Sequence, residues 1–302
     1  MLSRSLTFPS LADFWQLGKP RVVALIVFCA AVGCLMAVPP LADWPRLLMA
    51  LIGIGLVAMG AAAANCLFEQ DRDAVMRRTA ARPLVRGSVG SIEAALYATV
   101  LTLGGLGLLL LFANPLATGL TLATFFGYAV VYTRWLKPAT PQNIVIGGAA
   151  GAMPPVLGWA AVSGTIPAEA AVLFLIIYTW TPPHFWALAL YRRDDYARAG
   201  LPMLPVTHGQ AFTRLSILLY ALMLAAVALL PFVIRLSGWF YLAAALWLNG
   251  GFVQRAWRLY RDGDLASDEQ ARGLFRFSIA YLTWLFAALL ADRLLQWVLT
   301  LV

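Results

Sequence analysis

Residues 46–83 read RLLMALIGIGLVAMGAAAANCLFEQDRDAVMRRTAARP, and the character of the chain changes abruptly within this stretch. The 22 residues from Leu47 to Phe68 carry no charge, and about 20 such residues are enough for a helix to cross the hydrocarbon core of a bilayer. The following segment, residues 69–82, holds three carboxylates and four arginines. The stretch therefore predicts a membrane-spanning helix that ends in a dense polar cluster at one membrane surface.

The rest of the chain has the same apolar character. Of its 302 residues, 62% are hydrophobic and only 12% are charged, with a mean hydropathy of +0.79, which is far from the balance of soluble proteins. We therefore predict an all-α polytopic membrane protein, a nine-transmembrane-helix bundle that forms a single domain over residues 1–302. The apolar runs that define the predicted helices are 22–38, 46–67, 91–112, 115–133, 143–162, 168–190, 213–234, 237–253 and 274–300.

The distribution of Lys and Arg predicts how this bundle is oriented. With nine alternating helices, 19 of the 22 basic residues, Arg4 among them, fall on one side, and only Arg46, Arg235 and Arg293 fall on the other. The positive-inside rule then places the N-terminus in the cytoplasm and the C-terminus outside, as expected for a multi-pass protein of the cell inner (plasma) membrane. Topology and contact with membrane lipids account for the net charge of +8, so we predict no nucleic-acid partner.

Polar residues are concentrated at the predicted cytoplasmic surface. Ion-coupled transport usually requires ionisable residues in the middle of helices, and this chain has almost none. Carboxylates gather instead at helix ends and in two loops, 68–90 and 190–212, which we predict to be active-site loops, whereas residues 1–18 form a short cytoplasmic N-terminal segment. The three cysteines have no CxxC spacing, so we interpret them as packing residues.

The first polar cluster has a helical arrangement that suits a metal ion. Asn65, Glu69 and Asp73 follow one another at intervals of four residues, so on a helix they span about 80° and share one face, while Asp71 points away. Carboxylate and amide oxygens suit Mg²⁺, which leaves positions free for water and substrate phosphate. The neighbouring arginines, Arg72, Arg77, Arg78 and Arg82, could hold that phosphate. The alternative is a set of ordinary solvated ion pairs at a helix end.

The second cluster is WTPPHFWALALYRRDDYARAGLPMLPVTHG, residues 180–209. Pro182 and Pro183 lie in a predicted membrane helix, where they should kink it within a packed interior. If that helix continues, Asp195 returns to within about 20° of the face that carries His184. A single histidine in a helix is more often a packing residue than a ligand, and both interpretations of His184 stay open at this point.

The third cluster is YTRWLKPATPQNIVIGGAAGAMPPVLGWAA, residues 132–161. Tyr132, Arg134 and Lys137 fall at the cytoplasmic end of a predicted helix. The small residues of GGAAGAMPP either let helices pack closely or leave room for a bulky planar ligand.

Together these three clusters, with the KPR that begins at Lys19, resemble the protoheme IX farnesyltransferases, or heme O synthases, a branch of the UbiA-type intramembrane prenyltransferase superfamily. An asparagine and acid motif alone would indicate only the superfamily, whereas TPQNIVIGG and WTPPHFW with AGLPMLPV indicate the heme branch. The resemblance implies a Mg²⁺-dependent transferase that joins the farnesyl group of farnesyl diphosphate to a vinyl group of heme B, adds water and releases diphosphate. The product, heme O, would serve a heme A synthase or a terminal oxidase assembly.

The resemblance also implies roles for individual residues. Positions of the first acidic motif match Asn65, Glu69 and Asp73, with Asp71 inside it, as catalytic and Mg²⁺-binding residues. Glu69 stands where many relatives carry aspartate. The second acidic motif falls on Asp194 and Asp195, of which we expect Asp195 to contribute to the metal site. His184 stands where other branches begin that motif with an acid, which favours a role toward the heme acceptor.

Physical chemistry adds two expectations about the reaction. Charge that develops on the departing diphosphate needs nearby cations, for which we select Arg78, Lys137 and Arg198. The allylic cation needs a water-free cavity with aromatic walls, and the aromatic residues of the clusters are the candidates: Tyr128, Tyr132, Trp180, Phe185 and Trp186. Two other functions stay open, namely prenylation of an aromatic quinone precursor and a non-enzymatic role as a transporter or assembly chaperone.

Overall fold

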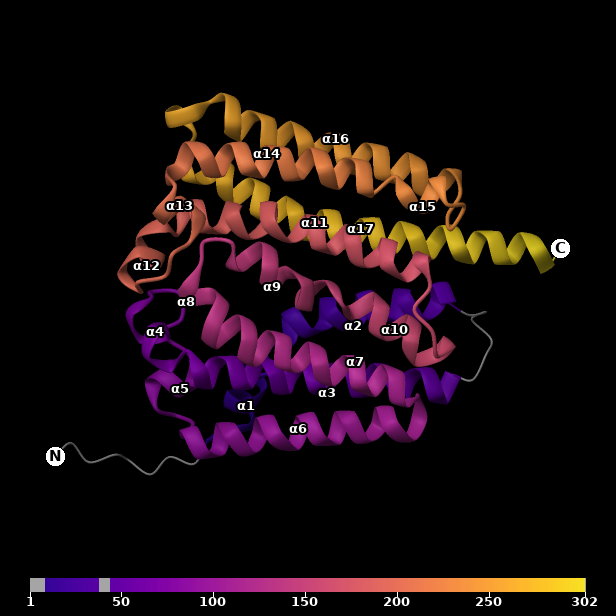
Figure 1. The fold of residues 1–302 in the computed structure, drawn as a ribbon, viewed down its shortest axis with the longest axis horizontal. Coiled ribbons are helices and arrows are strands. Elements are labelled where there is room, and N and C mark those ends of the chain that lie inside the picture. Colours follow the sequence, from indigo (N-terminus) through magenta and orange to yellow (C-terminus); the bar gives the residue numbers. More distant parts are fainter. Residues whose placement is uncertain (1–8, 38–43, 302) are drawn as a thin grey trace.

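The computed structural model describes residues 9–37 and 44–301, and in these ranges the chain is built of helices without a single strand (Figure 1). Nine long helical rows lie roughly side by side. In chain order they are α2 (Pro20–Ala37), α3 (Trp44–Phe68), α6 (Ser91–Phe112), α7 (Pro115–Phe126) with η1 (Gly127–Leu136) and α8 (Lys137–Ala139), α9 (Asn143–Ala152) with α10 (Pro154–Ser163), α11 (Ala168–Tyr191), α14 (Gly209–Val227) with α15 (Leu230–Val233), α16 (Trp239–Arg261) and α17 (Asp268–Leu301).

Eight of these rows are long and apolar enough to cross a membrane, so the chain is a multi-pass membrane protein. The ninth row, α16, is equally long, but arginines occupy its last turns, at Arg255, Arg258 and Arg261. The predicted nine-helix bundle is therefore confirmed in outline. Arg4, which contributed to the predicted orientation, lies outside the described residues.

The predicted helix boundaries differ from the structure in several places. The predicted helix 143–162 is divided at Met153, because Pro154 and Pro155 have no N–H with which to continue the hydrogen-bond ladder of α9. The predicted helix 115–133 continues to Ala139 through the π-helix η1. The last helix begins at Asp268, six residues before its apolar run.

Glycines bring the backbones of several rows into direct contact. A Cβ on Gly33 of α2 would lie 2.1 Å from the carbonyl oxygen of Pro155, and one on Gly158 of α10 would lie 1.9 Å from that of Ala30. Gly105 of α6 meets the carbonyl oxygen of Gly53 of α3 in the same way, at 2.5 Å. Small residues allow such close approach in membranes, where dispersion contacts replace the hydrophobic effect between helices.

Five short helices gather at one end of the bundle, on the left in Figure 1, which we call the polar end. They are α4 (Gln70–Val75), α5 (Pro83–Arg86), α8, α12 (Arg193–Arg198) and α13 (Leu204–Thr207). α1 (Leu11–Leu17) lies beside α3 and α5 near the same end. The two predicted active-site loops therefore lie at the same end of the molecule, as the alternating helix directions require.

Two segments of the polar end share one local design. α3 and α11 each end in a single residue with a distorted backbone, Glu69 (φ −105°, ψ 7°) and Arg192 (φ −116°, ψ 17°), and a six-residue helix follows. After each comes a proline-containing turn of helix, α5 or α13, and a glycine with positive φ follows within two residues of its end: Gly87 (76°) caps α5, and Gly209 (78°) follows His208, the cap of α13. The two acidic segments thus occupy equivalent places in two similar structural units.

Candidate active site

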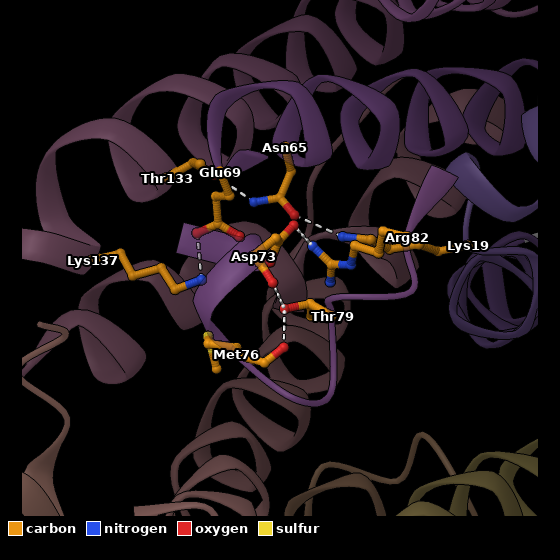
Figure 2. A network of polar contacts seen from close by, with 9 residues as sticks. All are labelled: Lys19, Asn65, Glu69, Asp73, Met76, Thr79, Arg82, Thr133 and Lys137. Carbon is orange, nitrogen blue, oxygen red and sulfur yellow. Dashed lines mark hydrogen bonds and ion pairs between the residues drawn. The ribbon is translucent and has the colours of Figure 1, made fainter. Parts of the chain in front are cut away.

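Asn65, Glu69 and Asp73 form one buried face at the polar end (Figure 2). Each of the three is only 3% exposed, whereas Asp71 is exposed. The distorted residue Glu69 does not disturb this register, because its N–H still donates to Asn65 O (3.1 Å) and its carbonyl accepts from Asp73 N (2.8 Å). The predicted face, including the outward direction of Asp71, is confirmed.

Each member of this face is bound by a cation. The Lys137 ammonium donates to the Glu69 carboxylate from one side, and Arg82 pairs with Asp73 from the other. Lys19 Nζ donates to Asn65 Oδ1 at 2.6 Å. Three separate parts of the chain therefore bring positive charge to one helical face.

The amide of Asn65 and the loop after Asp73 are both fixed by threonines. Asn65 Nδ2 donates to Thr133 Oγ1 at 3.1 Å, which leaves the amide oxygen directed toward Lys19. Thr79 Oγ1 donates to Asp73 O at 2.9 Å and closes the turn after α4. This turn returns Arg82 to the carboxylate of Asp73.

The surrounding charges decide the ionisation of Glu69. Burial alone would raise the pKa of its carboxyl group, but the charges of Lys137, Lys19 and Arg82 outweigh this effect, so the pKa lies below its ordinary value. Burial lowers the pKa of the Lys19 ammonium in turn. Glu69 is therefore held as a carboxylate although it is almost completely removed from water.

In the second acidic segment, the helix that carries His184 ends before it reaches Asp195. α11 ends at Tyr191 and Asp195 lies on the separate helix α12, so the continuous helix that the expected relation between His184 and Asp195 required is interrupted at Arg192. Arg192 has a distorted backbone but keeps the helical hydrogen bonds on both sides, from its N–H to Leu188 O (3.2 Å) and from Tyr196 N to its own carbonyl (3.2 Å). Asp195 is buried (5% exposed) and paired with Arg198 and, at 3.5 Å, with Arg192. Asp194 points to solvent, with only a 3.4 Å contact to Arg193.

The two acidic segments face each other across the polar end. Burial raises the pKa of Tyr196, which follows Asp195, and the charge of Arg78 opposes this shift while that of Glu69 adds to it. Arg78 itself is exposed beyond the first segment. The predicted phosphate-binding residues Arg78, Lys137 and Arg198 thus lie around the same end, and Lys137 is the one in direct contact with the acidic face.

Pro182 and Pro183 lie in α11, and the predicted aromatic residues are divided between η1 and α11. α11 continues through Pro182 and Pro183, and the residues around them are buried as expected. Tyr128 and Tyr132 stack on each other at 5.8 Å in η1, but Trp186 packs edge-on against Tyr220 of α14. The five candidate aromatics therefore do not form one wall.

His184 lies between two aromatic rings. It stacks on Trp180 (4.3 Å) and Phe275 (4.6 Å), and its Nδ1 lies 2.6 Å from Ser278 Oγ. Because Ser278 Oγ already donates its proton to Phe275 O at 2.6 Å, it accepts from Nδ1–H. This assignment leaves Nε2 unprotonated, which is the tautomer that can accept a hydrogen bond or ligate a metal.

The small residues of α9 serve packing in part. A Cβ on Gly147 would lie 2.2 Å from the Tyr132 ring, and one on Gly148 would lie 3.1 Å from Thr181. The interpretation as close helix packing is confirmed at these two glycines.

The oxygen donors fit a Mg²⁺ ion that is shared with a substrate. Glu69, Asp73 and the Asn65 amide present hard oxygens on one face, and Mg²⁺ commonly takes one or two protein carboxylates and leaves the rest to water and phosphate. Within the described ranges, no three acidic, histidine or cysteine side chains assemble into a closed metal site. Asp195 therefore does not join Glu69 and Asp73 in one such group.

Sequence reasoning assigned no site role to Lys19 or Thr133, and it considered Arg82 only as a possible phosphate ligand and not as the partner of Asp73. Lys19 and Arg82 are neutralising partners, and only the tertiary contacts select them among 22 basic residues. Lys19 has one local signal in the structure, a left-handed backbone (φ 50°), which is uncommon outside glycine.

Comparison with known proteins identifies the family. The model of the UbiA prenyltransferase family matches residues 26–290, so the chain belongs to this family. It is 63% identical over 286 residues to the protoheme IX farnesyltransferase of Azoarcus sp. (strain BH72), covering 94% of each chain. It is 58% identical to that of Cupriavidus taiwanensis, covering 95% of this chain and 92% of the relative.

Solved structures show the same fold at low sequence identity. A structure of digeranylgeranylglyceryl phosphate synthase aligns with a TM-score of 0.77 at 17% identity, covering 94% of this chain and 98% of the other. A UbiA homologue from Archaeoglobus fulgidus bound to DMAPP and Mg²⁺ aligns with a TM-score of 0.66 at 15% identity, covering 92% and 99%.

The buried pair of Lys137 and Glu69 generates a stability prediction. Lys137→Met should lower the free energy of unfolding by about 3–5 kcal/mol, because it leaves Glu69 buried without its cation. Adding Glu69→Gln should recover most of that loss. A double-mutant cycle measured by denaturant unfolding in detergent checks this coupling. The exposed pair Arg193 and Asp194 is the control, with an expected coupling of about 0–1 kcal/mol; an equally small coupling for Lys137 and Glu69 would contradict the prediction.

Proposed function

We propose that this member of the UbiA prenyltransferase family transfers the farnesyl group of farnesyl diphosphate to a vinyl group of heme B, giving heme O. The C–O bond to diphosphate breaks, and a C–C bond forms between the farnesyl carbon and the terminal vinyl carbon. Water then adds to the inner vinyl carbon and releases a proton. The near full-length similarity to named protoheme IX farnesyltransferases supports this substrate pair.

The observation that carries the proposal is the buried face of Asn65, Glu69 and Asp73 beneath a ring of cations. These three side chains would hold Mg²⁺, which when bound supplies positive charge to the departing diphosphate. We place Asp195 on the facing side of the diphosphate, as the acid of the second segment. Asp71 and Asp194, both exposed, would act only at the rim of the site.

The cations of the site would bind the diphosphate directly. Lys137 is already fixed beside Glu69, and Arg78 and Arg198 extend from the two facing segments. Their charge would stabilise the negative charge that grows on the diphosphate as the C–O bond breaks. Because Lys137 and Arg198 are already held by ion pairs, little reorganisation of these two cations would be needed at that moment.

The residues of η1 are the best placed to shield the allylic cation. Tyr128 and Tyr132 stack next to Thr133, which binds Asn65. Aromatic faces stabilise cations and exclude water. We therefore propose these two tyrosines as the wall nearest the diphosphate, with Trp180 and Phe185 of α11 farther from it.

For the acceptor, we propose that His184 orients or ligates heme B through Nε2. The hydrogen bond of Nδ1 to Ser278 and the stacking of the ring between Trp180 and Phe275 hold the imidazole in one orientation. Heme iron accepts neutral imidazole as an axial ligand. The product heme O is then expected to pass to a heme A synthase or a terminal oxidase assembly, and co-purification of such a partner would test this step.

The first prediction from this proposed function tests the reaction and its metal-binding face together. In cells that lack heme O, expression of this chain should produce heme O, detected by mass spectrometry of extracted hemes. Asp73→Asn should reduce its formation about 100-fold or more, because the charge that binds the metal is lost while the shape is kept. Asp71→Asn, at the exposed neighbour, should retain most of the activity.

Two outcomes would contradict this prediction. Equal losses in Asp71→Asn and Asp73→Asn would reject the assignment of roles by helical face. Formation of a prenylated quinone precursor in place of heme O would still support a prenyltransferase, but it would reject heme B as the acceptor.

The second prediction separates the roles of His184. His184→Phe preserves the aromatic stack, so the folded protein should persist, while heme binding and heme O formation should be lost. Binding of farnesyl diphosphate in the presence of Mg²⁺ should be nearly unchanged. Absorption spectroscopy of added heme B and equilibrium binding of labelled farnesyl diphosphate measure the two arms. Full activity of His184→Phe would show that His184 serves only packing. Loss of diphosphate binding with normal heme binding would assign His184 to the metal cluster.

The third prediction concerns orientation. We propose that the polar end faces the cytoplasm of a cell with this chain in its inner membrane, because most basic residues lie there. A reporter inserted at Gly87 or Gly209, both at exposed turns of that end, should report the cytoplasm. A reporter fused after Val302 should report the opposite side, and a cytoplasmic signal from it would reject the odd number of crossings.

A further inference from the structure

A second charged pocket lies at the end of the bundle opposite the polar end. Its volume is about 320 Å³, and its lining comes from α2, α10, α11, α17 and the connection between α15 and α16. These elements meet at the right in Figure 1. Three charged side chains, Glu169, Arg235 and Arg293, share it with apolar walls that include Met36 and Trp159.

The three charges of this pocket do not neutralise one another. Over residues 9–37 and 44–301, no ion pair or side-chain hydrogen bond joins Glu169, Arg235 or Arg293 to any group. Arg293 Nε is buried and has no acceptor. Arg235 is exposed, and Glu169 and Arg293 are half-buried. Because a buried polar atom such as Arg293 Nε is normally hydrogen-bonded, the unpaired charges of this pocket suit a ligand that carries both kinds of charge.

Arg235 occupies a backbone position that glycine would fill more easily. Its φ is 59°, in the left-handed region that follows the last turn of a helix. Leu236 N and Ser237 N both donate to Pro231 O, at 2.8 and 3.0 Å, which closes this turn. A long charged side chain at a strained position indicates that the guanidinium itself is used.

A buried carboxylate fixes the two arginines relative to each other. Asp292, next to Arg293 on α17, accepts from Ser237 Oγ (2.9 Å), Gly238 N and Tyr241 N (3.3 Å). It thereby clamps the turn that carries Arg235 onto α17. The pocket is consequently a rigid feature of the fold.

We propose that this pocket binds the head group of an ethanolamine glycerophospholipid at the membrane surface opposite the polar end. The phosphate would lie between Arg235 and Arg293, whose planar guanidinium groups suit phosphate oxygens. The primary ammonium would donate to Glu169, and Met36 and Trp159 would contact the glycerol backbone. Glu169 disfavours ligands that carry only negative charge, and this gives the pocket its selectivity.

The test uses the purified chain in detergent with four probes. Dihexanoyl phosphatidylethanolamine should raise the melting temperature at lower concentration than dihexanoyl phosphatidylcholine, dihexanoyl phosphatidylglycerol or inorganic phosphate. Arg235→Gly is the decisive variant, because glycine relieves the strained backbone and the protein should fold at least as well. It should weaken the apparent affinity for phosphatidylethanolamine about tenfold or more, the effect of losing one charge-assisted contact.

Two further variants define the selectivity. Glu169→Gln should abolish the preference for phosphatidylethanolamine over phosphatidylglycerol, whereas Arg258→Ala, an exposed arginine near the other end of α16, should change nothing. An unchanged lipid response in Arg235→Gly would overturn the proposal. An equal response to inorganic phosphate would overturn the assignment to a lipid, and a stronger response to phosphatidylglycerol would overturn the role of Glu169.

Discussion

The electrostatic cost of burying Glu69 and Asp73 is the constraint on which the polar end depends. Carboxylates that are 3% exposed at the end of an apolar bundle must be paired, or they lose their charge. Lys137 and Arg82 provide this pairing from opposite sides. Meeting this requirement joins α8 and the loop after α4 to the end of α3, so the charges of the site also hold its elements together.

The same arrangement suits the chemistry that we propose. A metal and a diphosphate would bring their own charges into the cluster, and the lysine and arginine side chains could then transfer from carboxylate to phosphate oxygens. Such an exchange keeps every buried charge compensated before and after binding. A site without the cations would be unstable when empty, and one without the carboxylates would have no means to hold the metal.

The charged side chains are arranged differently at the two ends of the bundle. At the polar end, acids and bases pair closely within the protein, whereas Glu169, Arg235 and Arg293 at the other end share a pocket and remain apart. We infer that the first end is organised for a diphosphate and the second for a lipid head group. The long apolar helices between them connect two surfaces with different partners.

The sequence by itself determined the fold class, the helical rows and the face of Asn65, Glu69 and Asp73, because these follow from local periodicity and from the cost of exposing polar groups to lipid. It also placed both acidic loops at one end, since helix directions alternate. The contacts of Lys19 with Asn65 and of Arg82 with Asp73 were decided only by the tertiary structure, which selects among many chemically equivalent basic residues. The break between α11 and α12 at Arg192 and the pocket of Arg235 could not be predicted either, because a backbone distortion at one residue and the meeting of distant helix ends leave no periodic signal.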